Sequence, residues 1–320
     1  MTSLFNALTT GDALTENGAV TNSTSGSNLV DLFGAAGSSR GQNLTSMFVK
    51  AFIENPDLAL RLAMFTRDPR GGYGERKHFR QWLEYSLAKL VDLEVGKALL
   101  SKVPEIGRYD DLIVGIEQGG ELKDHAISIW MRAIAVEKNA LAAKWMPRKG
   151  KVFNEVRKFL GVPPKTLRKL LVETTNVVET KMCSREWDKI DYNKLPSRAQ
   201  LLYRKAFARN DSARYQEYLE GLESGETKVN ASVLYPYEVL CKSSGDLMEA
   251  QWKALPDYVE GGSFLPVIDV SRSMYQGSGV QGVSCLDAAL SLGIYLAERS
   301  KSKFKDEFIT FSEVPRMCKL

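Results

Sequence analysis

The chain has 320 residues, of which 44% are hydrophobic and 26% charged, and its formal net charge is +4. This length suffices for a large buried core and predicts more than one domain. No run of about eighteen apolar residues exists, and the N-terminus lacks a basic region with a long apolar core, so we expect neither a membrane-spanning helix nor a secretory signal. Four scattered cysteines indicate reduced thiols, not a disulfide framework or a zinc site, and predict a cytoplasmic protein.

Residues 1–43 are predicted to form an irregular N-terminal arm. They are rich in Thr, Ser, Gly and Asn and have few periodic apolar positions. The fragment Leu29–Phe33 is apolar enough to dock on another surface, so full disorder of the arm is not expected.

From residue 44 to residue 258 the pattern predicts one helix after another. Ser46–Glu54 is expected to end at Asn55, and Pro56 to open the next helix. A further helix is marked by apolar residues at three- and four-residue steps, namely Phe79, Trp82, Leu83, Leu87 and Leu90. Asp124–Trp145 is predicted to be one long helix, and shorter ones follow at Lys165–Thr174, Ser197–Arg209, Ser212–Leu222 and Pro236–Lys242. The expected class is mainly α, with helix pairs stacked as a HEAT-like solenoid.

The segment 256–262 predicts the start of a second domain, residues 259–320. Strand Phe264–Asp269, helix Ser284–Arg299 and strand Glu307–Phe311 would form the opening β-α-β unit of a Rossmann-like α/β domain. Two strands and one helix leave a face and an edge of the sheet uncovered. We therefore expect a longer product or a second polypeptide to complete this domain.

The string Val267-Ile-Asp-Val-Ser-Arg-Ser-Met274 places oxygen-bearing side chains at alternate positions. In an extended segment, Asp269, Ser271 and Ser273 would point to the same side. One carboxylate and two hydroxyls suit Mg²⁺ or another divalent cation with waters as further ligands, and open α/β sheets bind ligands at the carboxyl ends of their strands. The alternative is chance, because average residue frequencies give this spacing in roughly one chain of this size in ten.

Positive charge is concentrated between residues 144 and 169. Nine basic residues stand there against the single acid Glu155, namely Lys144, Arg148, Lys149, Lys151, Arg157, Lys158, Lys165, Arg168 and Lys169. With Trp145 and Phe153 among them, this basic cluster suits phosphate groups of a nucleic acid. The alternative is a solvated basic helix face, since runs of like charge are common.

The string Arg67-Asp-Pro-Arg-Gly-Gly-Tyr-Gly-Glu-Arg76 combines three glycines with three arginines. The glycines allow a tight turn, and Arg67, Arg70 and Arg76 suit a phosphate or a carboxylate. Lys77 and His78 follow directly and are further candidates for RNA contact. The alternative is a helix–helix connector held by Arg–Asp pairing, and the string is not a Walker loop.

A catalytic set is not visible in the sequence. Neither histidine, His78 or His125, lies in a nucleophile or metal motif, and G-x-S-x-G and H-E-x-x-H are absent. Asp110 and Asp111 suit caps at a helix start better than acid/base partners. We therefore expect no enzymatic activity.

The order of several strings resembles the Ro autoantigen (TROVE) proteins. It resembles more closely their relatives of the DUF2828 type, which occur in bacteriophages and some eukaryotes. The strings are Arg67–Arg76, Gly107-Arg-Tyr-Asp-Asp-Leu112, Lys144-Trp-Met-Pro-Arg148 and Val267–Met274. Two further strings resemble the DUF2828 group, Met182-Cys-Ser-Arg-Glu-Trp-Asp-Lys-Ile-Asp-Tyr-Asn-Lys-Leu-Pro196 and Tyr235-Pro-Tyr-Glu-Val239. The resemblance starts near Thr15-Glu-Asn-Gly-Ala19 and runs to the end of the chain.

This resemblance implies a ring of HEAT-like helices closed by a von Willebrand factor A (vWA) domain. Ro proteins bind small structured RNAs on the basic outside of the ring and single-stranded ends of misfolded RNAs through its hole. By analogy, the basic cluster is the first candidate for a phosphate-binding surface and the Arg67–Arg76 string the second. Asp269, Ser271 and Ser273 match the first part of the vWA metal-ion-dependent adhesion site (MIDAS). That site also takes a later Thr and Asp, for which Thr310 is not a convincing match.

Two functions follow from these expectations. The first is an RNA-binding chaperone or quality-control protein, a ribonucleoprotein component whose affinity falls with salt and which favours single-stranded ends through aromatic stacking. The second is a protein-interaction module, in which a partner's carboxylate completes the metal site and the helices serve as a scaffold.

Overall fold

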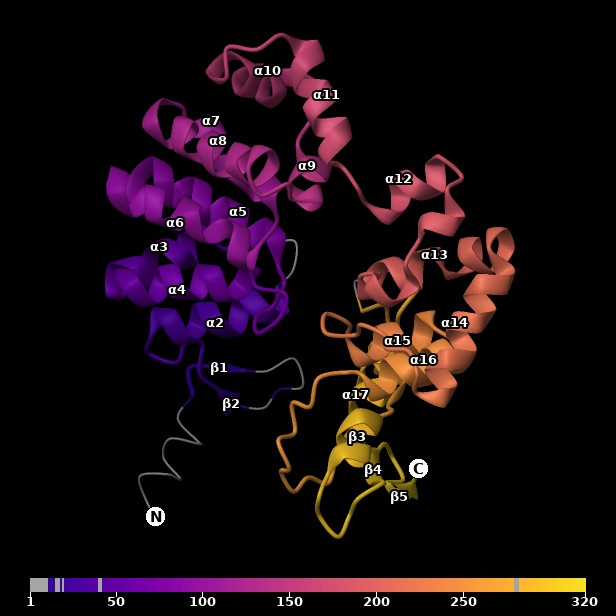
Figure 1. Ribbon diagram of the computed structural model, residues 1–320. Coiled ribbons are helices and arrows are strands. Elements are labelled where there is room, and N and C mark those ends of the chain that lie inside the picture. Colours follow the sequence, from indigo (N-terminus) through magenta and orange to yellow (C-terminus); the bar gives the residue numbers. More distant parts are fainter. Residues whose placement is uncertain (1–10, 15–17, 19, 40–41, 279–281) are drawn as a thin grey trace. The chain divides into compact units, whose positions relative to one another are not determined.

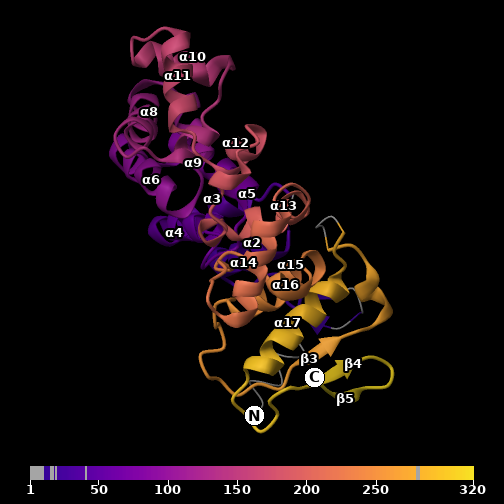
Figure 2. The same ribbon diagram turned by 45° about the vertical axis from the view of Figure 1, so that its right-hand side comes forward.

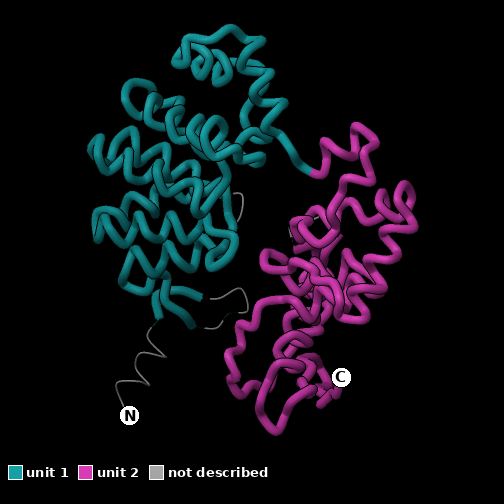
Figure 3. Tube along the Cα trace, in the orientation of Figure 1, with its two compact units in different colours: residues 1–177 teal, residues 178–320 magenta. Residues whose placement is uncertain are grey.

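The computed structural model describes residues 11–14, 18, 20–39, 42–278 and 282–320. The chain divides into two compact units, unit 1 with residues 1–177 and unit 2 with residues 178–320 (Figure 3). Helices make up most of both units, so the mainly α class is confirmed. The division after Val177 cuts through the range 44–258 that the sequence assigns to one domain. The boundaries at 43 and 258 stay a prediction, as do the HEAT-like and Rossmann-like vWA assignments.

Unit 1 is a stack of helices preceded by a short antiparallel ladder of β1 (Ala13–Leu14) and β2 (Val20–Thr21). Figure 1 shows α2 to α8 packed side by side, with sequential neighbours in contact. The helical elements of unit 1 are α2 (Asn28–Ser38), α3 (Thr45–Glu54), α4 (Pro56–Arg67), α5 (Arg76–Tyr85), η1 (Ser86–Leu90), α6 (Leu93–Ile106), η2 (Tyr109–Leu112), α7 (Ile113–Gln118), α8 (Gly120–Ala135), α9 (Ala140–Trp145), α10 (Gly150–Phe159) and α11 (Pro164–Thr174).

Local signals place the boundary between α3 and α4 where the sequence predicts it. The side chain of Asn55 accepts a hydrogen bond from the backbone N–H of Leu58 at 3.1 Å, which satisfies one unpaired donor of the first turn. Pro56 lacks an N–H and fits the first helical position. The predicted apolar stripe is also confirmed, because Phe79 and Trp82 are fully buried and Trp82 stacks on Phe48 with 5.1 Å between ring centroids.

Two predictions for unit 1 are corrected. Asn28–Ser38 forms α2, where an irregular arm was expected, because Ser27 caps the helix and Leu32 is fully buried. The docking expected for Leu29–Phe33 is thereby confirmed. The expected helix Asp124–Trp145 is two helices, since Lys138 adopts a left-handed φ of 53° and the Asn139 side chain caps α9. Within the segment where the resemblance starts, residues 15–17 and 19 lie outside the described residues.

Unit 2 combines helices with a small sheet. Its helical elements are α12 (Val178–Cys183), η3 (Trp187–Lys189), η4 (Tyr192–Lys194), α13 (Ser197–Asn210), α14 (Ser212–Ser224), α15 (Pro236–Lys242), α16 (Gly245–Lys253), η5 (Arg272–Tyr275) and α17 (Cys285–Arg299). One of its cores is aromatic, with Tyr192, Phe207, Tyr215 and Tyr218 in mutual ring contact.

The sheet of unit 2 contains β3 (Val267–Asp269), β4 (Glu307–Phe311) and β5 (Arg316–Lys319) in the order β3-β4-β5. β3 and β4 are parallel and β5 is antiparallel to β4. Helix α17 lies along β3 and β4 (Figure 2), where a Cβ on Gly293 would come within 2.2 Å of Ile268 Cδ1. The expected β-α-β unit is therefore present, although β3 begins three residues later than predicted. Pro266, directly before β3, has no N–H to donate, and its carbonyl accepts a hydrogen bond from the backbone N–H of Ile309 at 2.9 Å.

The sheet face opposite α17 is uncovered by the described residues. Val267, Phe311 and Met317 are 62%, 57% and 54% exposed, whereas Ile268 on the α17 side is buried. No helix in the described part of the chain is long and apolar enough to cross a membrane.

Candidate functional site

The Arg67–Arg76 string contributes a buried ion pair to unit 1. Arg67 stands at the end of α4, and its Nε donates to Asp111 Oδ2 at 2.8 Å. Arg80 on α5 donates from Nε to Asp111 Oδ1 at 2.6 Å. The Asp111 side chain has no exposed surface, and that of Arg67 is 7% exposed. A single buried carboxylate therefore ties α4, α5 and η2 together.

Arg108 extends this network to a third string. Its backbone N–H donates to Asp111 Oδ2 at 3.0 Å, its guanidinium pairs with Asp110, and its Cζ lies 3.6 Å from the ring centroid of Trp145. Burial opposes the charged form of Asp110, but hydrogen bonds from Arg108 and Arg80 outweigh burial and hold the pKa of Asp110 below its usual value. The strings 67–76, 107–112 and 144–148 thus meet in one network.

Glycines allow the close contacts in this network. A Cβ on Gly107 would lie 2.7 Å from Asp111 Oδ2, and a Cβ on Gly72 would lie 1.7 Å from the carbonyl oxygen of Phe65. A side chain at position 72 would require the backbone to move, and one at position 107 would displace the Asp111 carboxylate from its partners. The connector interpretation of the Arg67–Arg76 string is confirmed, since the string joins α4 to α5 and Arg67 pairs with Asp111. The predicted cap at a helix start is confirmed for Asp111, whereas Asp110 pairs with the side chains of Arg80 and Arg108.

The predicted RNA contact is wrong for two residues, Arg67 and His78, because both are buried. Arg67 is held inside by Asp111, and His78 is fully buried, where its Nε2 donates to the carbonyl of Gln42 at 2.9 Å and its ring stacks on Trp82. Neither side chain offers a surface to a phosphate group. Arg70, Arg76 and Lys77 are exposed, although Arg70 also donates to the carbonyl of Glu105 at 3.3 Å.

The basic cluster lies on α10, α11 and the segments before them. Lys149, Lys151 and Lys165 are exposed and have no acidic partner among the described residues. Other members are partly neutralised, since Lys158 lies 3.5 Å from Glu155 and Lys169 lies 3.8 Å from Glu173. Arg157 Nε donates to the Asn154 side chain at 3.1 Å.

The aromatic rings in the basic cluster are covered by guanidinium groups. Arg168 lies over Phe153, which is 2% exposed, and Arg108 lies over Trp145, with Lys144 5.7 Å from the same ring. Arg148 is half-buried, donates to the hydroxyl of Thr175 at 2.9 Å, and has its pKa lowered by burial. Among the described residues, the exposed chemistry of the cluster is therefore mainly ammonium groups on flexible stems.

The string Val267–Met274 brings three oxygen-bearing side chains together at the end of β3. The backbone N–H of Ser271 donates to Asp269 Oδ1 at 2.8 Å, and the hydroxyls of Ser271 and Ser273 lie 3.0 Å apart. Hydrogen bonds from the hydroxyl and the backbone of Ser271 lower the pKa of Asp269, which keeps this carboxylate ionised.

These three side chains fit a hard divalent cation in donor type, but they supply a single negative charge. Among the described residues no group of three or more His, Cys, Asp or Glu side chains that could hold a metal is present. Thr310 pairs in register with Ile268, and its hydroxyl donates to the carbonyl of Arg316 at 3.3 Å. The metal site and its ligands Asp269, Ser271 and Ser273 stay a prediction.

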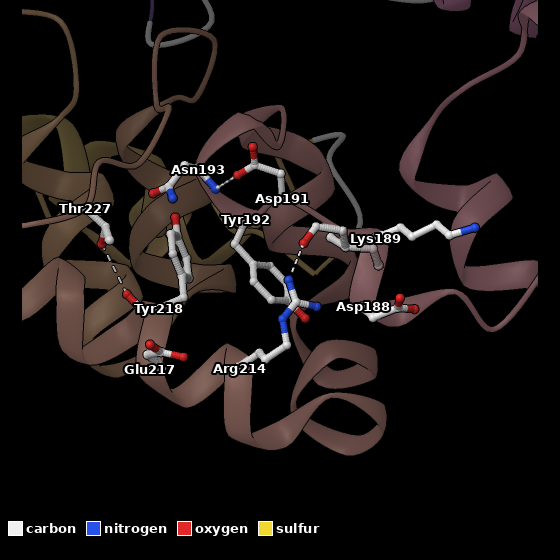
Figure 4. Close-up of a pocket in the computed structure, with 10 residues that line it drawn as sticks. Asp188, Lys189, Asp191, Tyr192, Asn193, Arg214, Glu217, Tyr218 and Thr227 are labelled. Atoms are coloured by element: carbon white, nitrogen blue, oxygen red, sulfur yellow. Dashed lines mark hydrogen bonds between the residues drawn. The ribbon is translucent and has the colours of Figure 1, made fainter.

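A pocket of about 400 Å³ in unit 2 was not predicted from the sequence (Figure 4). Its walls come from η3, η4, helix α14 and the segment after α14, and its lining residues are Asp188, Lys189, Ile190, Asp191, Tyr192, Asn193, Arg214, Glu217, Tyr218 and Thr227. Arg214 is fixed by donating to the carbonyls of Trp187 and Ile190 and to Asp211, at 2.7, 2.7 and 2.9 Å. This anchoring holds η3 and η4 against α14.

One sequence signal points to this pocket. The Met182–Pro196 string supplies six of the lining residues, from Asp188 to Asn193. The string folds into two short 3₁₀ turns, η3 and η4, and such turns have no apolar periodicity. The sequence alone therefore assigns this string neither a regular element nor a function. The partners on α14 lie more than twenty positions away, and only the tertiary fold brings them together.

Comparisons with known proteins match nearly the whole chain. The family model described as "Domain of unknown function (DUF2828)" matches residues 15–86 and 156–261, and "Domain of unknown function (DUF7788)" matches residues 263–320. An uncharacterized protein of Acanthamoeba polyphaga mimivirus is 30% identical over an alignment of 362 positions, which covers 95% of this chain and 62% of the viral protein. The chain thus spans less than two thirds of this relative. No solved structure matches the chain significantly. The resemblance to Ro proteins stays a prediction.

Proposed function

Because the chain belongs to the DUF2828 family, we propose its function from its own surface: it binds RNA through phosphate contacts made by the basic cluster. The supporting observation is the set of exposed ammonium groups of Lys149, at the N-cap of α10, Lys151 on α10 and Lys165 on α11, which have no acidic partner in the part of the chain that the structure describes. Exposed cations without acidic partners attract a polyanion and release its counterions on binding.

Several neighbouring residues extend this surface. The contacts of Lys158 with Glu155 and of Lys169 with Glu173 are long, 3.5 and 3.8 Å, so a phosphate can compete for these two lysines. Arg168 lies over Phe153 and still has exposed surface. The covered rings of Trp145 and Phe153 favour phosphate recognition over base stacking at this place, which fits the sequence-independent binding expected of an RNA chaperone or quality-control protein.

The test is a salt series with fluorescently labelled structured and single-stranded RNAs. In the triple variant Lys149→Gln, Lys151→Gln and Lys165→Gln, we expect the negative slope of log Kobs against log salt to become shallower by about 2–3. Each lost phosphate contact reduces the magnitude of the slope by about 0.7–0.9. The matched control replaces Lys50, Lys89 and Lys138, three exposed lysines of unit 1, with Gln. Equal slopes for both variants, or no binding by folded chain at low salt, would refute the proposal.

A second candidate function rests on the side chains at the end of β3. The converging oxygens of Asp269, Ser271 and Ser273 support a divalent-cation site at which a partner protein's carboxylate acts as a further ligand. The bound cation would supply positive charge and open coordination positions. Asp269 would hold it, and Ser271 would orient Asp269 through the hydrogen bond from its backbone.

Calorimetric titration with Mg²⁺ and Mn²⁺ tests this second candidate directly. We expect binding by the wild-type chain and loss of binding in Asp269→Asn, which keeps the size of the side chain and removes its charge. Asp306→Asn, on the segment before β4, is the control. Equal heats for the two variants would exclude Asp269 as a ligand.

A further inference from the structure

The pocket between η4 and α14 has an excess of unpaired negative charge. Both cations in its lining are already engaged, Lys189 with Glu186 at 2.6 Å and Arg214 with Asp211 at 2.9 Å. Asp191 is paired with Lys194 at 3.0 Å. The carboxylate of Glu217 has no hydrogen-bond or ion-pair partner among the described residues, and that of Asp188 interacts electrostatically with Lys189, which already pairs with Glu186. A ligand that fits this charge carries a cation.

Tyr218, which lines the pocket, has a buried hydroxyl proton without an acceptor among the described residues. Tyr218 is 5% exposed, and its hydroxyl accepts a hydrogen bond from Gln200 Nε2 at 2.9 Å. The orientation of the Gln200 amide is set by its other bonds, since Nε2 also donates to the carbonyl of Tyr192 and Oε1 accepts from Gln251. Gln200 therefore cannot accept the Tyr218 proton, and no other acceptor for it is present in the described part of the chain.

Tyr218 keeps its proton at physiological pH, and burial raises the pKa of Tyr218 to about 12. A buried donor without an acceptor is costly, which favours a ligand that brings one. Asn193 adds an exposed side-chain amide that can both donate and accept. Figure 4 shows the rings of Tyr192 and Tyr218 side by side, with Glu217 beside Tyr218. Tyrosine rings pack well against the aliphatic stem of a long side chain.

From this arrangement we propose that the pocket binds an arginine or lysine side chain of another polypeptide. The cation pairs with Glu217, Asp188 attracts it at the rim, and a backbone carbonyl of the bound peptide accepts the Tyr218 proton. A free polyamine fits less well, because its protonated nitrogens have no acceptor to offer Tyr218. The volume of about 400 Å³ lies within the roughly 300–1,000 Å³ typical of ligand sites.

The experiment is an NMR titration of the whole ¹⁵N-labelled chain with the peptide acetyl-Gly-Gly-Arg-Gly-Gly-amide. We expect shifts of the Asn193 side-chain amide and of the Glu217 and Thr227 backbone amides. A peptide with citrulline in place of arginine keeps the shape and lacks the charge, and it should bind about tenfold more weakly, as should the arginine peptide to Glu217→Gln. Glu223→Gln, an exposed residue later on α14, is the matched control and should bind as the wild type does.

Tyr218→Phe tests the hydroxyl, with a thermal melt to confirm that the variant is folded. Weaker peptide binding by folded Tyr218→Phe, with spermidine binding unchanged, supports the assigned carbonyl contact. Equal binding of the arginine and citrulline peptides, or shifts confined to residues outside the pocket, overturns the proposal. The proposal is also overturned if the chain binds cytidine but not the peptide and Glu217→Gln abolishes the cytidine binding. That result would make the pocket a nucleobase site.

Discussion

Asp111 accepts hydrogen bonds from two guanidinium groups and one backbone N–H at a place without solvent. Removing its carboxylate leaves Arg67 buried without a counter-charge, which typically costs about 3–5 kcal/mol. We expect Asp111→Ala to lower the free energy of unfolding by this amount in urea denaturation. The ion pair between Asp57 and Arg61 is the control, because both side chains are at least 70% exposed. Asp57→Ala should cost at most about 1 kcal/mol, and similar losses for both variants would contradict the assigned role.

The burial of Arg67 and His78 could not be predicted from the sequence. Arg67 and His78 have the residue types of an RNA contact, and nothing in the string around them states that they are buried. Their partners Asp111 and Gln42 lie 44 and 36 positions away. The alternative of Arg–Asp pairing was available from the residue types. Choosing between the two alternatives required the tertiary fold.

At the scale of elements, the tyrosines on η4 and α14 make the stability of unit 2 depend on alkaline pH. Burial raises the pKa of Tyr218 from 10 to about 12, and burial followed by the contact with Asp211 raises the pKa of Tyr192 further. A raised folded-state pKa gives stability that is present below pH 10 and lost as pH rises toward the folded-state pKa.

We therefore expect the midpoint of urea unfolding for unit 2 to be constant from pH 7 to 9 and to fall between about pH 10 and 12. Tyrosine absorbance at 295 nm should report ionisation together with unfolding. Tyr218→Phe should weaken the pH dependence, whereas Tyr275→Phe, at a 69% exposed tyrosine, should not. If the stability of Tyr218→Phe depends on pH as that of the wild type does, Tyr218 is not a source of the loss of stability at alkaline pH.

Elements with strong local signals could be predicted from the sequence. Asn55 and Pro56 fix the start of α4, and the pattern after Ser284 gives α17, whose first turn Ser284 and Asp287 cap reciprocally. The break between α8 and α9 was missed because apolar periodicity continues through it, while Lys138 and Asn139 adopt a turn. The pocket was missed because a 3₁₀ turn such as η4 has no periodic pattern, and its wall on α14 depends on the anchoring of Arg214.

For the whole molecule, unit 1 has its own large core, which runs from Leu32 on α2 to Leu171 on α11. We expect residues 1–177 produced alone to unfold cooperatively, as followed by circular dichroism, and to bind RNA with the salt slope of the full chain. Residues 178–320 should bind RNA more weakly at every salt concentration. RNA binding that requires both pieces would show that the basic cluster is not sufficient.

The network of Arg67, Arg80 and Arg108 has a consequence for genetics. A screen for loss of RNA association would recover substitutions at these arginines as readily as at Lys149. Because Arg67 and Arg108 lie in conspicuous sequence strings, the mutated positions would resemble an RNA-recognition site. The two classes differ in protein abundance, because cells degrade chains whose folded fraction drops. Measuring the amount of soluble chain in each mutant would separate defects of folding from defects of contact.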